Sequence, residues 1–340
     1  MTRRTFWIAL AVVVALAASA AGFTALAWRE LNAPLPLAAD AEWLRVPTGT
    51  PFWRVTVDLA ERGLLDSPRL LAIYARITGD ATRIHAGEYQ LTAGLTPLTL
   101  LAKLVRGDVY LHQFTIVEGS RFADVLVALR AHPAIAATDL DGAAIMAALG
   151  AANVHPEGQF FPDTYRFPLG TSDLDVLRLA HGALATRLEA AWRSRDVNLL
   201  LKSDYEALTL ASIVEKETAL ASERRLIAGV FHERLRRNMR LQTDPTVIYG
   251  LGAAFDGNLR RQDLERDTPY NTYTRAGLPP TPIALPGAAS IEAAVSPQVT
   301  GAIYFVATGR GDGSHYFSAT LEEHEGAVRD YLRRLRSQEP

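Results

Sequence analysis

The apolar residues of the chain form one long uncharged run near the N-terminus, followed by regions in which apolar and polar positions alternate. Residues 6–28 are 23 uncharged, mostly apolar residues. A helix of this length rises about 34 Å, which is enough to cross the hydrocarbon core of a bilayer. A cleaved signal peptide is the alternative, with the small residues at 18–20 as its cleavage site. The length of the run and the position of Trp7 and Trp28 near its ends favour a retained transmembrane helix.

The charges beside this run predict its orientation. Arg3 and Arg4 precede it, and the positive-inside rule keeps them in the cytoplasm. Residues 1–28 therefore form a cytoplasmic tip and a single transmembrane helix in the inner (cytoplasmic) membrane, and everything beyond them is exported to the periplasmic or extracytoplasmic side. Residues 29–41 contain two prolines and little periodicity, which predicts a linker.

A pattern of strand, glycine turn and amphipathic helix then occurs twice. The segment RVPTGTPFWRVTVDLAERG can be laid on TIVEGSRFADVLVALRAHP, which pairs Gly49 with Gly119 and Thr50 with Ser120. Each copy predicts a strand, a turn at the glycine, a helix capped by the Ser or Thr, and an amphipathic helix. Repeated units of this kind are also simply easy to fold, so the repeat alone assigns no function.

The segments between the two copies complete a small α+β module. Residues 67–79 predict a helix, 87–91 a strand, and 96–107 a second helix with Thr96 as its N-cap and a proline in the first turn. The module therefore spans residues 42–112, and its place beside the membrane suits binding or spacing better than catalysis.

An irregular aromatic segment follows at 155–172, with the sequence HPEGQFFPDTYRFPLGTS, and a helix is predicted after it at 173–193. Aromatic and polar side chains in such a segment can form a surface on which sugars stack. The alternative is a loop held on the core by Phe160, Phe161 and Tyr165. Composition leaves both interpretations open.

The helix predicted in DYEALTLASIVEKETAL carries an acidic residue on its apolar face. At about 100° per residue, Leu210, Ile213, Val214 and Glu217 lie within roughly 60° of one another. A carboxylate on an apolar face loses hydration, so its pKa rises and it can donate a proton near neutral pH. The alternative is that the helix ends there and Glu217 reaches solvent or pairs with an arginine.

The neighbouring charges are predicted to be solvated. Glu215 and Lys216 point away from the apolar face, and Asp204 is the expected N-cap of this helix. Ser222 is predicted to cap a second helix whose other face carries five arginines, most of them expected to be in contact with solvent. These five are Arg224, Arg225, Arg234, Arg236 and Arg237.

Composition removes several functional classes. The 340-residue chain has a net charge of −2 and a pI near 6.5, so nucleic acid is not an expected partner. Cysteine is absent, which excludes disulfides and a cysteine nucleophile. HERLR lacks the second histidine of a zinc protease, and no Walker loop, dinucleotide fingerprint or nucleophile elbow occurs, so no metal and no cofactor is expected.

Several long motifs together resemble one known family. The runs EGQFFPDTY, ASIVEKETA, RLQTDPTVIYGLG, TPYNTYTRAGLPPTPIALPG and IYFVATGRGDGSHYF occur in the order and spacing of the MltG (YceG-like) family of membrane-anchored endolytic murein transglycosylases. The resemblance covers essentially the whole chain. It implies an α+β protein with one N-terminal membrane helix, a LysM-like module at 42–112 and a mixed α+β catalytic domain at 113–340.

The resemblance also implies a reaction. The family's catalytic glutamate is the second in its Glu-Lys-Glu-Thr run, which falls on Glu217. The enzyme would cleave the β-1,4 bond between N-acetylmuramic acid and N-acetylglucosamine within a glycan strand. Glu217 would protonate the leaving oxygen and then accept the proton of the muramic C6 hydroxyl, whose oxygen closes a 1,6-anhydro ring. Thr218 follows the acid, as a serine does in other lytic transglycosylases, and the resemblance makes it a further candidate for substrate binding.

Four further residues match the family's motifs. Gln242 and Asp244 lie in LQTDPT, and Asn271 and Tyr273 lie in YNTYT. They are the candidates for holding the N-acetyl and hydroxyl groups of the sugars. Each of them could instead hold the loops in place, and Asp244, which precedes a proline, is also a typical turn former.

Two other functions remain open at this point. A muramidase-type hydrolase would need a second carboxylate about 5–9.5 Å from the first, for which Asp244 and Asp163 are the candidates. A non-catalytic cell-wall binding or scaffold protein would gain nothing from a desolvated acid. The expected partners are peptidoglycan strands, the membrane and the peptidoglycan synthases. Family and topology predict cleavage of nascent strands near the membrane, which would end glycan elongation during cell wall biogenesis.

Overall fold

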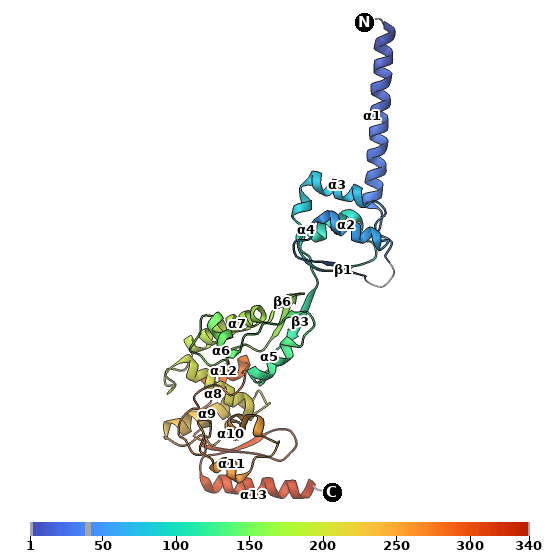
Figure 1. The fold of residues 1–340 in the computed structure, drawn as a ribbon. Coiled ribbons are helices and arrows are strands. Elements are labelled where there is room, and N and C mark those ends of the chain that lie inside the picture. Colours follow the sequence, from blue (N-terminus) through green and yellow to red (C-terminus); the bar gives the residue numbers. More distant parts are fainter. Residues whose placement is uncertain (1–2, 38–41, 339–340) are drawn as a thin grey trace. The chain divides into compact units, whose positions relative to one another are not determined.

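The structure, a computed structural model, describes residues 3–37 and 42–338 (Figure 1). Its contacts divide the chain into two compact units. The first comprises residues 1–112 with 167–169, and the second comprises 113–166 with 170–340. About half of the chain is helical and the strands within the described ranges form four separate two-stranded sheets, so the predicted α+β class is confirmed.

The first unit begins with a long apolar helix, α1 (Arg3–Asn32). Within the described residues it is the one helix long and apolar enough to cross a membrane. The helix continues past the predicted end at residue 28, and its last turn enters the core of the module that follows. Leu31 and Leu35 are buried there, and the backbone N–H of Leu35 donates to the carbonyl of Leu95 at 2.7 Å. Residues 29–37 are therefore not a free linker, and 38–41 lie outside the described residues.

The module has a strand–helix–helix–strand–helix order, and a single antiparallel pair of strands holds it together. Its buried side chains form one continuous core that includes Leu59, Leu71, Tyr89 and Leu104. Its resemblance to LysM stays a prediction. The elements are β1 (Glu42–Val46), α2 (Phe52–Glu61), α3 (Pro68–Thr78), the short 3₁₀ helix η1 (Asp80–Thr82), β2 (Gly87–Leu91) and α4 (Pro97–Arg106).

The two glycines paired in the sequence repeat both adopt left-handed backbone conformations. Gly49 has φ 79° and Gly119 has φ 75°, so each turn needs the freedom that glycine provides. The predicted Ser and Thr caps are wrong, because the helices begin one residue later, after Pro51 and Arg121, and neither has a side-chain cap. The cap predicted at Thr96 is confirmed, since its hydroxyl accepts from the N–H of Thr99 at 3.2 Å.

The second unit starts with short strands and helices. The strand β3 pairs with β5, and β4 pairs in parallel with β6. In the aromatic segment at 155–172, Phe160, Phe161 and Tyr165 are buried. This burial supports the interpretation that the segment is a loop packed on the core, and not a surface on which sugars stack. The elements are β3 (Leu111–Thr115), α5 (Phe122–Arg130), β4 (Ile135–Ala136), α6 (Gly142–Ala148), β5 (Thr164–Pro168) and β6 (Thr171–Ser172).

Four helices make the core of this unit: α7 (Asp173–Arg193), α8 (Asp204–Glu217), α9 (Arg224–Arg236) and α12 (Ala288–Val295). The helix α8 lies at the centre and packs against the other three. Its residues Ala207–Val214 are all buried, which explains why it is apolar on every side rather than on one stripe. At Gly229 of α9, a Cβ atom would lie 2.1 Å from the carbonyl oxygen of Gln298, so only glycine allows this close approach.

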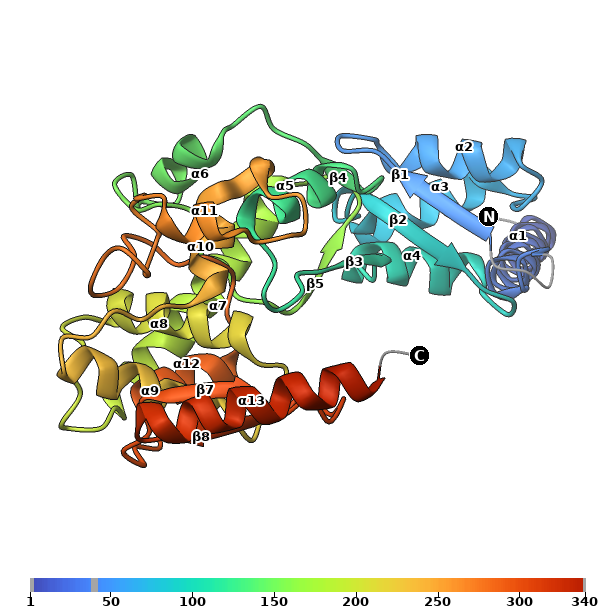
Figure 2. The ribbon, with the colours of Figure 1, turned by 90° about the horizontal axis from the view of Figure 1, so that it is seen from below.

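The remaining elements surround this core. The strands β7 and β8 are antiparallel and form a hairpin around GRGDG. The C-terminal helix α13 packs along this hairpin (Figure 2). The elements are α10 (Asp244–Leu251), the 3₁₀ helix η2 (Gly252–Ala254), α11 (Arg261–Glu265), β7 (Tyr304–Ala307), β8 (His315–Ser318) and α13 (Leu321–Gln338).

Candidate active site

Glu217 is the last residue of the central helix α8. The helix begins at Ser203, whose hydroxyl accepts from the N–H of Glu206, so the expected cap at Asp204 is corrected by one residue. Thr218 ends the helix with an extended backbone. Other helices enclose α8 as far as Val214. The Glu217 side chain therefore projects from the end of a well-packed apolar helix.

The end of α8 is fixed by an ion-pair network on the opposite side from Glu217. Glu215 pairs with Arg224 at 3.1 Å and accepts from the N–H of Gly287 at 3.0 Å. Its side chain is only 6% exposed, so the prediction that Glu215 is solvated is wrong. Lys216 is exposed, as predicted, and its ammonium donates to the carbonyl of Gly119 at 3.2 Å.

A threonine cluster holds the carboxyl of Glu217. The hydroxyl of Thr243, at the start of α10, donates a hydrogen bond to Glu217 Oε1. The backbone N–H of Thr243 donates to the hydroxyl of Thr272 at 3.1 Å, and the hydroxyl of Thr246 donates to the carbonyl of Thr243 at 2.8 Å. All three threonines are buried. The backbone of Thr243, from which its hydroxyl projects, is therefore held by its neighbours.

The environment of Glu217 raises its affinity for a proton. Burial raises the pKa of the carboxyl from 4.5 to about 7, and the negative charge of Asp244 adds to the rise. The hydrogen bond from Thr243 and the positive charge of Arg234 oppose it. A carboxyl with a pKa near 7 can both donate and accept a proton at neutral pH, which is the requirement for a general acid and base.

Arg234 is a buried cation near this site, although the sequence predicted it on a solvated face. Its Nε donates to the carbonyl of Ile303 at 2.6 Å and its Nη1 to the carbonyl of Leu241 at 2.7 Å. The guanidinium lies over the ring of Tyr304, 5.4 Å from its centroid. Within the described part of the chain no carboxylate forms an ion pair with it. Its charge therefore acts on Glu217 without a nearer anion to neutralise it.

Asp244 and Tyr273 form a pair at the exposed side of the site. The phenol of Tyr273 donates to Asp244 Oδ1 at 2.5 Å. Asp244 is exposed and Tyr273 is half-buried, and burial together with Asp244 raises the pKa of the phenol. Gln242 is also exposed, and its φ of 49° is a left-handed conformation that is unusual for a residue with a side chain. Asp244 and Tyr273 both lie close enough to Glu217 to interact with it electrostatically.

Asn271 and Thr218 are placed differently. Asn271 is fully buried, and its amide nitrogen donates to the carbonyls of Asp263, Leu264 and Arg266 at 2.7–3.2 Å. Its amide oxygen accepts from the N–H of Tyr273 at 2.8 Å. All of its hydrogen-bonding capacity is used within the loop, which favours the alternative that it holds the loop in place. The hydroxyl of Thr218 accepts from the N–H of Leu220 at 3.0 Å and so shapes the turn after Glu217.

Sequence reasoning missed Thr243 and misplaced Arg234. Thr243 lies between two residues that it did select, Gln242 and Asp244, so the motif marked the right segment. No pattern in the sequence distinguishes Arg234 from the other four arginines predicted on the same face, because its burial depends on segments that are distant in the chain. The described residues contain no group of three His, Asp or Glu side chains arranged to bind a metal ion.

The fold and the site together define a class: a chain with an apolar N-terminal helix and an α+β unit that presents one carboxyl with a raised pKa, suited to acid–base catalysis. The chain belongs to the YceG-like family, whose model matches residues 44–330. It is similar to a Bacillus subtilis protein named endolytic murein transglycosylase, with 32% identity over 85% of this chain and 84% of the relative.

Two further comparisons agree. A Streptococcus pneumoniae protein, also named endolytic murein transglycosylase, is 26% identical over 97% of this chain, which spans 65% of that longer relative. The crystal structure of a putative YceG-like protein from Listeria monocytogenes matches with a TM-score of 0.52 and 28% identity, covering 85% of this chain and 99% of that one.

Proposed function

We propose that the protein is an endolytic murein transglycosylase that cleaves bonds between N-acetylmuramic acid and N-acetylglucosamine within peptidoglycan strands and leaves 1,6-anhydro ends. Family membership and the relatives named for this activity support the reaction class. The single observation that carries the residue assignment is the pKa of about 7 of the Glu217 carboxyl, which is held by the hydroxyl of Thr243.

In this mechanism Glu217 acts twice. The protonated carboxyl gives its proton to the glycosidic oxygen as the bond to the muramic C1 breaks. The resulting carboxylate accepts the proton of the muramic C6 hydroxyl, and the C6 oxygen bonds to C1 to close the anhydro ring. The substrate supplies the nucleophile, so one carboxyl is sufficient and Glu217 ends the cycle protonated again.

Different neighbours of Glu217 stabilise its protonated form and its carboxylate form. Asp244 raises the pKa of Glu217 and so favours the protonated form that starts the reaction. Arg234 and the hydrogen bond from Thr243 favour the carboxylate that forms after the first proton transfer. We assign Gln242, Asp244 and Tyr273 to the sugar groups around the bond, and Asn271 and Thr218 to the loops that carry them.

A hydrolase is the second candidate function. The observation that favours it is the presence of a second carboxylate, Asp244, near Glu217. Asp244 lies close enough to Glu217 to raise its pKa, whereas Asp163 is held by Arg187 at 3.9 Å and by the N–H of Thr164 at 2.7 Å. A hydrolytic mechanism would therefore use Asp244 as the second carboxylate.

We also propose a place in the cell. The apolar helix α1 would span the inner membrane with its N-terminus in the cytoplasm, and the two units would lie outside, where nascent glycan is made. Cleavage there would end the elongation of strands, and the peptidoglycan synthases are the partners that this position implies. Residues 42–112 would form the membrane-proximal module and 113–340 the catalytic domain.

The test is mass spectrometry of the products that the full-length protein in detergent releases from uncrosslinked glycan strands, beside the Glu217→Gln variant. Internal fragments that end in 1,6-anhydromuramic acid and are absent with the variant are expected. Fragments with reducing ends would identify a hydrolase. No cleavage by either protein, with glycan still bound, would identify a binding protein.

A further inference from the structure

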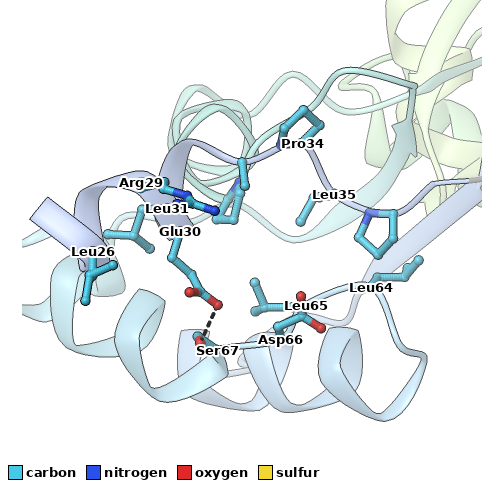
Figure 3. Close-up of a pocket in the computed structure, with 13 residues that line it drawn as sticks. Leu26, Arg29, Glu30, Leu31, Pro34, Leu35, Leu64, Leu65, Asp66 and Ser67 are labelled. Carbon is cyan, nitrogen blue, oxygen red and sulfur yellow. Dashed lines mark hydrogen bonds between the residues drawn. The ribbon is translucent and has the colours of Figure 1, made fainter.

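A pocket lies where the last turns of α1 meet the module (Figure 3). Its volume is about 340 Å³. Three charged side chains border it, Arg29 and Glu30 from α1 and Asp66 from the loop before α3. Its remaining walls are largely apolar, and Leu31 and Leu65 are themselves buried in the core of the module. The pocket therefore combines an apolar wall with charges of both signs.

The chain itself fixes the level of this pocket relative to the bilayer, given the membrane-spanning helix proposed above. The apolar run ends at Trp28, and Leu31, three residues later, is already part of the core of the module. Three helical residues rise only about 4.5 Å, which leaves no spacer between the hydrocarbon core and the module. Leu26, still within the apolar run, lines the same pocket. The opening therefore lies at the depth of the lipid headgroups.

The charges decide which ligand fits. Glu30 is oriented by the hydroxyl of Ser67, which donates to its carboxylate at 2.9 Å (Figure 3). The side chains of Arg29 and Asp66 have no hydrogen-bond or ion-pair partner within the described residues. Two carboxylates against one guanidinium disfavour a purely anionic group such as a diphosphate. A zwitterionic group, with a cation and an anion a few bonds apart, matches both signs.

We propose that this pocket binds the headgroup of a phospholipid that carries a primary ammonium, a phosphoethanolamine. The ammonium donates to the carboxylates of Glu30 and Asp66, and the phosphate accepts from the guanidinium of Arg29. The acyl chains lie along α1 beside Leu26. An ammonium with three N–H donors satisfies two carboxylates, whereas a choline headgroup has no N–H donor to offer them.

Native mass spectrometry of the full-length protein tests this proposal. The protein is released from nanodiscs that contain equal amounts of phosphatidylethanolamine, phosphatidylcholine and phosphatidylglycerol with the same acyl chains. The ethanolamine lipid is expected to be retained preferentially. Arg29→Gln and Asp66→Asn should each lower its occupancy by about threefold to tenfold, as the loss of one charge-assisted hydrogen bond at a partly exposed site does.

Two variants outside the pocket serve as matched controls. Arg54→Gln and Asp58→Asn make the same changes on α2, at positions that do not line the pocket, and should leave lipid retention unchanged. Circular dichroism checks that all four variants are folded. Equal retention of the three lipids, preference for phosphatidylglycerol, or equal losses in pocket and control variants would overturn the proposal.

Discussion

The hydroxyl of Thr243 donates a hydrogen bond to the carboxyl of Glu217, which joins the N-terminus of α10 to the C-terminus of α8. The two residues are 26 positions apart in the chain. Because Thr243 is itself held by Thr246 and Thr272, the bond fixes which way the carboxyl faces.

Replacing Glu217 by Gln should abolish cleavage while glycan binding is retained. Glutamine keeps the shape of the side chain but can neither donate nor accept the proton, so we expect a loss of about 100-fold to 10,000-fold in kcat. Product release from glycan strands measures the rate, and co-sedimentation with peptidoglycan measures binding. A variant that keeps most of its rate would remove Glu217 from the catalytic role.

Cleavage should depend on the titration of Glu217. In the proposed mechanism the reaction starts from the protonated carboxyl, whose pKa is about 7, so log kcat should fall toward a slope of −1 as pH rises above this value. The pH profile of kcat under saturating substrate measures this limb. A flat profile between pH 6 and 9 would contradict the assignment.

The same pKa predicts how stability changes with pH. The folded state binds the Glu217 proton more tightly than the unfolded chain, whose pKa is near 4.5. The stability linked to this proton is fully present below pH 4.5 and is lost as pH rises through about 7. Glutamine does not titrate, so Glu217→Gln should be more stable than the wild type at pH 8, by roughly 3 kcal/mol at most, and similar to it at pH 5. Urea unfolding at the two pH values measures the difference.

Thr243→Val should raise the pKa of Glu217, because it removes the hydrogen bond that favours the carboxylate. The alkaline limb of the pH profile should move to higher pH. The value of kcat should fall by about tenfold, because the hydrogen bond no longer orients the carboxyl. Thr243→Ser keeps the hydroxyl and is the matched control, with a profile close to that of the wild type. Identical pH profiles for the Val and Ser variants would show that the hydrogen bond from Thr243 does not affect the pKa of Glu217.

Asp244→Asn should move the alkaline limb in the opposite direction. Asp244 raises the pKa of Glu217, so removal of its charge lowers that pKa. Tyr273→Phe removes the hydrogen bond between the two side chains but leaves the charge of Asp244, and it should shift the profile less. Complete loss of activity in Asp244→Asn, together with reducing-end products from the wild type, would favour the hydrolase.

Asn271→Ala should act mainly through stability. It leaves three partly buried carbonyls without their donor, which we expect to lower the free energy of unfolding by about 1–3 kcal/mol. Asn258→Ala, at an exposed position of a neighbouring loop, is the control and should have little effect. A stable Asn271→Ala variant with a raised KM would instead place Asn271 at the sugar.

The local parts of the fold were readable from the sequence. The strand at 87–91 and the helix at 173–193 have the predicted bounds, because their patterns and turn residues are complete within the segment itself. The position of Glu217 at the end of an apolar helix is likewise a local property, and its catalytic role stays a prediction. The helix caps at Thr50, Ser120 and Asp204 were wrong by one residue, the range over which several polar residues compete to end a helix.

The remaining features depend on contacts between distant segments. Arg234 and Glu215 look like surface charges in the sequence, and both are buried by loops that lie 60 or more positions further along the chain, at Ile303 and Gly287. The hydrogen bonds of Asn271 are likewise determined by the folded loop, which brings three backbone carbonyls within reach of its amide nitrogen. Periodicity within one helix carries no information about these partners.

The continuity of α1 with the core of the module has a rotational consequence. Because Leu31 lies in the last turn of α1 and is also a core side chain of the module, each residue inserted or deleted between Trp28 and Leu31 turns the module by about 100° about the helix axis and moves it by about 1.5 Å along that axis. The angular position of the module relative to the apolar part of α1 is thus encoded in the number of residues between them. Insertions or deletions in this short stretch should therefore rotate the module in steps of about 100°. The original orientation of the module about the helix axis is restored only when the added or removed residues make up nearly a whole number of turns.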